Sequence, residues 1–251
     1  MGAATSLFIL ATAFVTAVLT GVFGLAGGLV LMGALALVLP VSAAFVTHGL
    51  IQIVANGARA ILHRRHIRWS IVGLYALGAV AAALLVALVR YAPSKPLLFL
   101  LLGLSPALVW LPKRVLAMDA ARPFHALLCG LGVTGLNLLA GVAGPLLDLF
   151  FVRTEMTRHQ IVATKAGTQV FSHLAKVIVF GAPMLTLAQP GMPPLWVFLA
   201  AVPLSILGTM VGGRILDRMS DQAFLKYTRW LVTGIGGIYL VQAWRLWQGG
   251  G

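Results

Sequence analysis

The chain has 251 residues, of which 60% are hydrophobic and only 9% are charged. A soluble globular domain has about 25% charged residues, so this composition excludes an ordinary soluble fold. The 18 lysines and arginines outnumber the 5 acidic residues and give a net charge of +13, but they lie at the ends of long apolar runs. A nucleic-acid-binding protein would gather them on one solvated surface. We instead expect an all-α, polytopic membrane protein. Its basic residues would lie at the anionic cytoplasmic leaflet of the membrane.

Eight apolar runs follow one another along the chain. They cover roughly residues 5–39, 41–62, 69–89, 96–111, 124–152, 160–180, 195–215 and 224–247. The first and fifth runs have 35 and 29 residues, whereas a membrane-spanning helix needs about 20. Each of these two runs contains a glycine cluster, at 24–28 and at 141–145, so we predict a broken helix in each.

The fifth run is predicted to enter and leave the membrane on the same side. Its two arms, 124–138 and 144–152, are shorter than a full span at about 1.5 Å per residue. With this hairpin, three basic residues, Arg90, Lys95 and Arg245, fall on one side and twelve on the other, which the positive-inside rule identifies as cytoplasmic. The twelve are Arg64, Arg65, Arg68, Lys113, Arg114, Arg122, Arg153, Arg158, Arg214, Arg218, Lys226 and Arg229.

The two broken runs begin two similar halves. An ungapped offset of 117 residues aligns the glycine clusters and pairs Gln52 with Gln169, with seven identities in the 36 pairs that start at residues 24–59. Because the hairpin makes the matched runs point in opposite directions, we predict two inverted repeats, 1–115 and 123–248. Each would be a broken or re-entrant helix followed by three transmembrane helices. Many secondary transporters have this architecture and bind substrate at the repeat interface.

Polar side chains form a stripe on the run that follows each break. The run 41–62 carries, at spacings of four, four and three residues, His48, Gln52, Asn56 and Arg59. The run 160–180 repeats this spacing with Lys165, Gln169, His173 and Lys176. Residues so spaced share one helical face, and ionisable groups at membrane depth usually face a cavity or the bundle interior.

An anion is the expected ligand, because the three cations of these runs face a single carboxylate at similar depth, Asp148. Glycine lets the backbone approach a ligand closely, and the N–H groups at a helix N-terminus favour negative charge. We therefore add Gly27, Gly28 and Gly144 to the predicted anion-binding site.

Simpler interpretations remain open for several of these residues. Arg59, Lys165 and Lys176 lie near membrane faces, where a long basic side chain can extend to water. The two stripe histidines can be hydrogen-bonded packing residues, and the glycines can serve close helix packing. Asp148 can carry a proton, pair with Lys165 or stabilise a helix N-terminus.

No motif indicates an enzyme, a cofactor or a metal site. The sequence has no ATP-binding phosphate loop, no HExxH signature and no GxSxG elbow. His63 and His66 have a metal-like spacing but stand among arginines, so we interpret them as loop charge. The single cysteine, Cys129, lies in an apolar run, where we expect it to be buried.

Three glycine-based motifs stand out: the cluster at 24–28, its counterpart at 141–145, and Gly208, Gly212, Gly213 and Arg214 in a late run. With them the chain resembles the sulfite exporter TauE/SafE family of membrane transporters over about residues 5–247. It departs from the family pattern at Pro145, which replaces the second glycine of the pair. The resemblance implies export or import of small sulfur-containing anions such as sulfite, organosulfonates or thiosulfate.

We therefore expect a secondary transporter in a bacterial inner membrane that exports such an anion by alternating access. The anion would be bound by His48, Gln52, Asn56, Lys165, Gln169, His173 and the glycine backbone. Arg59 and Lys176 would act as gates or attract the anion, and Asp148 could couple transport to protons. The expected partners are the anion and membrane lipid, with neither nucleic acid nor cofactor. The competing interpretations are a passive small-anion channel and a non-transporting membrane subunit.

Overall fold

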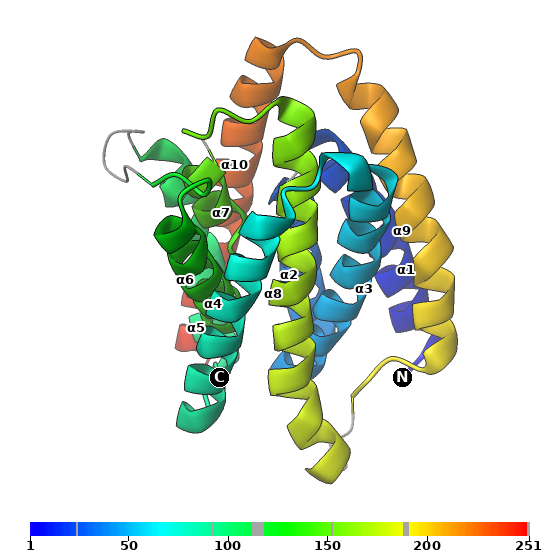
Figure 1. The fold of residues 1–251 in the computed structure, drawn as a ribbon. Coiled ribbons are helices and arrows are strands. Elements are labelled where there is room, and N and C mark those ends of the chain that lie inside the picture. Colours follow the sequence, from blue (N-terminus) through cyan, green and yellow to red (C-terminus); the bar gives the residue numbers. More distant parts are fainter. Residues whose placement is uncertain (24, 92, 112–117, 152, 188–190, 250–251) are drawn as a thin grey trace.

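The structure, a computed structural model, describes residues 1–251 except 24, 92, 112–117, 152, 188–190 and 250–251. Within these residues helices lie side by side along one main direction, and there are no strands (Figure 1). The helices are α1 (Ala3–Phe23), α2 (Leu25–Val38), α3 (Val41–Leu62), η1 (Arg64–His66), α4 (Trp69–Val89), α5 (Lys95–Leu104), η2 (Ser105–Trp110), α6 (Pro123–Ala140), α7 (Gly144–Phe151), α8 (Arg158–Leu187), α9 (Leu195–Leu216) and α10 (Asp221–Gln248). The predicted all-α membrane fold is confirmed.

Apolar side chains cover much of the outside of this bundle, and several polar side chains are buried inside it beside an apolar core. Among the described residues, five helices are long and apolar enough to cross a membrane, namely α1, α3, α4, α6 and α9. Leu88, Leu199 and Ile238 are exposed on the outside, whereas His48 and Lys176 are buried. This distribution suits a membrane, because the exposed apolar side chains contact lipid hydrocarbon instead of water.

Helix α8 is longer than predicted. It continues past residue 180, through Pro183, to Leu187, whereas the apolar run was expected to end at 180. A proline is tolerated inside a membrane helix where neighbouring groups satisfy the backbone around it. By contrast, α3 and α4 have the same bounds as the predicted runs 41–62 and 69–89.

The second break forms the predicted hairpin. Gly141 ends α6 in the left-handed conformation, with φ of 80°, which glycine adopts without strain. The N–H of Ala120, just before α6, donates to the carbonyl of Phe150 in α7 at 2.8 Å, so α7 returns to the end at which α6 starts. With 18 residues, α6 is about 27 Å long at 1.5 Å per residue, longer than the predicted arm.

The first break is shorter than predicted. Helix α1 ends at Phe23 and α2 already begins at Leu25, so Gly27 and Gly28 are helical; Gly24 lies outside the described residues. Helix α1 has 21 residues, enough for a full span at about 20 residues. The two breaks therefore differ. Within the described residues, a stretch of non-helical backbone separates the two arms only at the second break.

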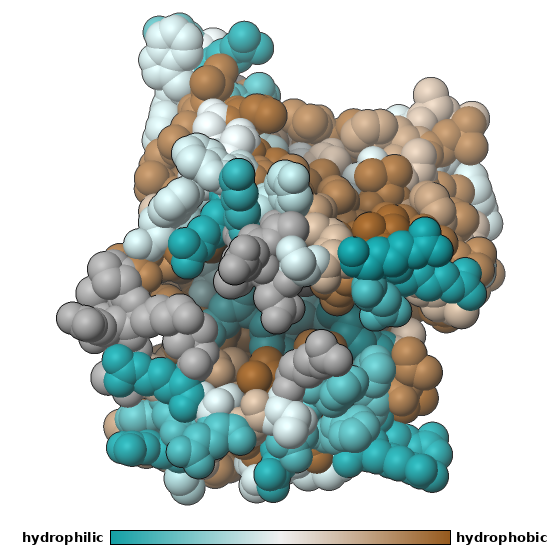
Figure 2. Space-filling view, turned by 90° about the horizontal axis from the view of Figure 1, so that it is seen from above, coloured by the Kyte–Doolittle hydropathy of each residue, from teal (hydrophilic) through white to brown (hydrophobic). Residues whose placement is uncertain are grey.

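One end of the bundle, which we call the basic end, collects the arginine-rich connections. The N–H of Arg68, after α3, donates to Thr164 Oγ1 near the start of α8 at 3.0 Å, and Figure 1 shows the α7–α8 and α9–α10 connections at this same end. Helix α3 thus runs toward the basic end and α8 away from it. Figure 2 looks onto this end and shows a central hollow with hydrophilic walls. Lys113 and Arg114 lie outside the described residues, and the cytoplasmic location of this end remains a prediction.

Four tight helix pairs build the bundle: α1 with α9, α4 with α6, α3 with α8, and α5 with α10. Glycines permit these contacts. A Cβ added to Gly21 of α1 would lie 2.8 Å from the Cα of Gly212 in α9, and one added to Gly103 of α5 would lie 3.0 Å from the carbonyl of Gly236 in α10. If each helix from α1 to α5 is taken as equivalent to the helix five places later, the pair α1–α9 corresponds to the pair α6–α4. The pairs α3–α8 and α5–α10 each correspond to themselves, as two repeats would require. The inverted repeats and their limits at 115 and 123 remain predictions.

Gly130 and Gly135 of α6 provide a matched test of this packing. A Cβ at Gly130 would collide with the backbone of Tyr75 in α4, whereas one at Gly135 would meet nothing. We expect Gly130→Ala to lower the stability by about 1–3 kcal/mol because the backbones must separate. Gly135→Ala should be neutral or stabilising by up to about 1 kcal/mol. Thermal unfolding in detergent measures both, and equal melting temperatures would contradict the α4–α6 contact.

Candidate functional site

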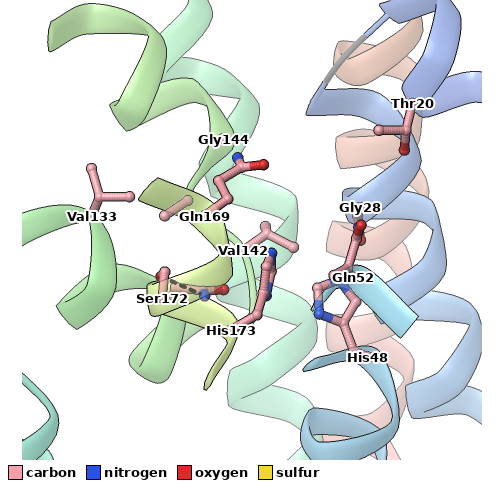
Figure 3. A pocket seen from close by; sticks show the side chains of 12 residues that line it. Thr20, Gly28, His48, Gln52, Val133, Val142, Gly144, Gln169, Ser172 and His173 are labelled. Carbon is pink, nitrogen blue, oxygen red and sulfur yellow. Dashed lines mark hydrogen bonds between the residues drawn. The ribbon is translucent and has the colours of Figure 1, made fainter. Parts of the chain in front are cut away.

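A cavity lies where both helix breaks meet the crossing of α3 and α8 (Figure 3). Its volume of about 40 Å³ has room for about three water molecules at roughly 10–15 Å³ each. Both halves of the chain contribute to its walls. The lining residues are Thr20, Gly28, His48, Gln52, Val133, Asn137, Val142, Ala143, Gly144, Gln169, Ser172 and His173.

Gly49 brings the two polar stripes together. A Cβ at this position would lie 2.7 Å from Val177 Cγ2 and 3.2 Å from the carbonyl of His173, so α3 and α8 can cross this closely only with a glycine here. The ring centroids of His48 and His173 are consequently 5.4 Å apart. Figure 3 shows the α3 and α8 side chains approaching the cavity from opposite sides.

The cavity walls present backbone and side-chain groups that can bind a ligand. Gly28 in the first turn of α2 and Gly144 at the start of α7 both line it, and helix N-termini favour anions. His173 Nδ1 and Asn137 Oδ1 are buried without a hydrogen-bond partner among the described residues. Because leaving a buried polar atom unpaired costs about 1–3 kcal/mol, we expect water or a ligand at these atoms.

Lys176 lies against this cavity without reaching its surface. The residue is completely buried; its Nζ donates to the carbonyl of Gly141 at 2.5 Å and to His48 Nδ1 at 3.2 Å. Since Nδ1 accepts from the ammonium group, His48 carries its proton on Nε2, which donates to the carbonyl of Gly28 at 3.1 Å. A chain of hydrogen bonds therefore connects the two breaks. The interpretation of Lys176 as a side chain extending to water is wrong.

Arg59 makes a similar but looser contact at the other break. It is half-buried, and its Nη2 donates to the carbonyl of Thr20 near the end of α1 at 3.5 Å. The 117-residue offset pairs Arg59 with Lys176, and each cation binds a carbonyl at the C-terminal end of the helix before a break. Cations are favoured there because the helix dipole is negative at this end. The two contacts differ mainly in exposure and length.

Lys165 and Asp148 form an ion pair at the side of the cavity. Their side chains are 27% and 36% exposed, and neither residue lines the cavity. Of the three roles left open for Asp148, pairing with Lys165 is therefore the one that the structure contains. The carboxylate is thereby occupied, and neither Lys176 nor Arg59 forms an ion pair within the described part of the chain.

Comparison with protein families matches the profile described as Sulfite exporter TauE/SafE to residues 9–240. The chain belongs to the sulfite exporter TauE/SafE family. The matched region runs from α1 into α10 and includes both breaks and the α3–α8 crossing. No match was found among curated proteins or among solved structures. The suspected family is confirmed, and membership identifies a multi-pass membrane transporter for small anions rather than an enzyme family.

In this TauE/SafE protein the structure gathers six of the predicted site residues at the cavity: Gly28, His48, Gln52, Gly144, Gln169 and His173. Gly27 does not line the cavity, because it packs against α1, where a Cβ would collide with Thr16 and Thr20. Asn56 is also behind the wall, and its Nδ2 donates to the backbone carbonyl of Gln52 at 3.0 Å. Gly27 thus follows the packing interpretation left open for the glycines.

Six residues that line the cavity were not predicted. Thr20 and Asn137 are also related by the 117-residue offset, and both are polar residues late in the helix before a break, so this signal was present in the sequence. Ser172 directly precedes His173, and its Oγ accepts from Asn137 Nδ2 at 2.8 Å. Val142 and Ala143 belong to the glycine cluster at 141–145, which the sequence analysis identified as a break without assigning these two residues to the site. Nothing in the sequence distinguishes the apolar Val133.

Proposed function

We propose that this TauE/SafE protein is a secondary transporter that exports a small sulfur-containing anion, such as sulfite or an organosulfonate, by alternating access. The observation that carries the proposal is the cavity at the crossing, beside cations that have no carboxylate partner among the described residues. A sulfur oxyanion presents several acceptor oxygens and negative charge. Buried N–H donors and helix N-termini are the groups that bind such oxygens.

In the proposed site the anion lies between Gln52 and Gln169. The two amides donate from opposite helices. His173 Nδ1 has no hydrogen-bond partner in the part of the chain that the structure describes, and His173 lines the same cavity. The start of α7 at Gly144 adds backbone N–H groups. The charge of Lys176 reaches the anion through His48, because the ammonium group polarises the ring to which it donates.

The side of the cavity away from the basic end is packed shut, which favours a carrier over a passive channel. Phe45 of α3 and Phe180 of α8 have ring centroids 4.4 Å apart, and Lys176 Nζ lies 5.2 Å from the centre of the Phe45 ring. A channel needs a continuous hydrated path. A non-transporting subunit, the other alternative, would have no need of buried cations at a cavity.

Flux in proteoliposomes that contain only this chain tests the proposal. Sulfite, thiosulfate, a two-carbon sulfonate and a carboxylate of matched size are compared, and saturable movement of the sulfur anions alone is expected. Gln52→Ala and Gln169→Ala should each weaken anion affinity about 10- to 100-fold, because a hydrogen bond to a charged group contributes about 1.5–3 kcal/mol. Gln242→Ala, on α10 away from the cavity, is the control. Unchanged affinity and flux in both glutamine variants would disprove this site.

Arg59 and Lys176 are proposed to act as alternating gates. In this structure the Lys176 contact is short and buried and the Arg59 contact is long and half-exposed, as a conformation open toward the basic end requires. In the opposite conformation the two contacts would exchange their roles: Arg59 would become buried at the end of α1, and Lys176 would release Gly141.

The gate proposal predicts that replacing Lys176, but not Arg59, opens the side opposite the basic end. Lys176→Met removes a buried unpaired charge while keeping an apolar chain, and should open the side opposite the basic end. Ser172→Cys in a Cys129→Ser background reports this opening through reaction with a membrane-impermeant maleimide added to that side. We expect labelling to rise at least about tenfold, a shift of about 1.4 kcal/mol. Arg59→Met should not raise it, and equal labelling of the two variants would refute the alternation.

Proton coupling through Asp148 is a further part of the proposal. It is supported by the position of this carboxylate beside Lys165 at the side of the cavity. Asp148→Asn keeps the shape of the side chain but cannot carry a proton, so uptake of the anion should no longer respond to an imposed pH gradient. Undiminished response in this variant would exclude Asp148 as the coupling group and leave His173 as the next candidate.

A further inference from the structure

A second and larger cavity opens on the outer surface of the bundle between α4 and α8. Its volume is about 970 Å³, and its walls are mostly apolar. We call it the α4–α8 groove. Helix α4 lines it with Ala76, Ala79, Ala83 and Ala87 among others, and α8 lines it with larger residues such as Phe171 and Ile178. It shares no lining residue with the cavity between the two breaks.

The groove exists because α4 has too little side-chain volume on this face. Near the basic end the two helices touch, since a Cβ at Gly167 of α8 would lie 3.4 Å from Val72 of α4. Farther from that end, alanines recur on α4 at spacings of three and four residues and leave space in front of α8. From Ala76 to Arg90 the groove extends over fourteen residues of α4, about 21 Å.

One end of the groove is polar. Ser42, Arg90 and Tyr91 line it at the end opposite the basic end. Arg90 ends α4 in the left-handed conformation, with φ of 50°, and is exposed. It belongs to the three basic residues on the side where the positive-inside rule predicts few. The groove thus combines an apolar body with a cationic, hydroxyl-bearing rim.

We propose that the α4–α8 groove binds one anionic phospholipid of the leaflet opposite the basic end. The phosphate lies against Arg90, and an acyl chain extends along the alanines of α4. The groove, at about 21 Å, is long enough for the acyl chain, because one leaflet contributes about 15 Å of hydrocarbon, half of a bilayer core of about 30 Å. A guanidinium group binds phosphate oxygens in a bidentate, charge-assisted manner.

The charge at the rim favours a lipid over a second copy of the chain. A second copy would bring its own Arg90, Lys95 and Arg245 to the same level of the membrane, next to the Arg90 of the first. Like charges placed together at an interface are unfavourable. An anionic lipid instead neutralises Arg90. Its acyl chain can also adapt to the shape of the groove, whereas a helix of about 10–12 Å diameter would have to fit the groove along its whole length.

The proposed lipid lies behind the helix that carries half of the anion site. On α8, Gln169 and His173 face the inner cavity, while Phe171, Leu174 and Ile178 face the groove. The acyl chain therefore supports α8 from the outside, where α4 leaves it without a packing partner. Loss of the lipid would allow α8 to move toward α4.

Native mass spectrometry of the purified chain, titrated with phosphatidylglycerol or phosphatidylcholine, tests the proposal. We expect one tightly bound phosphatidylglycerol, with phosphatidylcholine binding at least about tenfold more weakly. Arg90→Gln should weaken phosphatidylglycerol about tenfold, whereas Arg245→Gln, at the same end of the molecule but outside the groove, should not. Ala83→Leu, which fills the groove, should displace the lipid, whereas Ala81→Leu, exposed on α4 and outside the groove, should not.

Three outcomes would overturn the proposal. If phosphatidylglycerol has the same affinity for the Arg90→Gln variant as for the unchanged chain, its headgroup does not lie against Arg90. Equal affinity for the two lipids would leave only non-selective filling of the groove by membrane lipid. A dimeric mass that Ala83→Leu converts to a monomer would identify a second copy as the occupant. None of these readouts depends on transport, so the result is independent of the proposed function.

Discussion

A helix that ends inside a membrane leaves carbonyl groups that water cannot reach, and the interior of this protein is arranged around that constraint. Lys176 supplies the donor for the end of α6 at Gly141, and its side chain is completely buried as a result. Because Lys176 Nζ donates to Nδ1 of His48, the ring carries its proton on Nε2. This Nε2–H donates to the carbonyl of Gly28 in the first turn of α2. One amino group thereby satisfies broken backbone and connects the two halves, and in the proposed site it would also provide the positive charge that an anion needs.

Much of this architecture could be predicted from hydropathy and spacing alone. The bounds of α3 and α4, the hairpin at Gly141 and the meeting of Gln52 with Gln169 follow from periodicity and from the positive-inside rule. Burial of individual cations could not be predicted, because spacing assigns a residue to a helical face but not to a depth along it. Arg59 and Lys176 have equivalent positions in the two stripes, yet only Lys176 is fully buried.

The α4–α8 groove was invisible in the sequence for a different reason. A stripe of alanines on α4 is normally a sign of close helix packing, and near the basic end the two helices do approach closely. The space appears beyond the close contact at Gly167, where α4 carries alanines, and how closely two helices pack depends on all their neighbours. In the two proposals above, a polar anion binds on one face of α8 and an apolar chain binds on the other.

The four glycine-mediated pairs also constrain how the protein is made. Each pair takes one helix from the first half and one from the second, so α1, α3, α4 and α5 all leave the ribosome before their partners exist. Until then, the glycine face of α1 at Gly21 and that of α5 at Gly103 must stay in lipid or be shielded by an insertase. Of the helices in these pairs, α1 has to wait longest for its partner, because α9 begins only at Leu195.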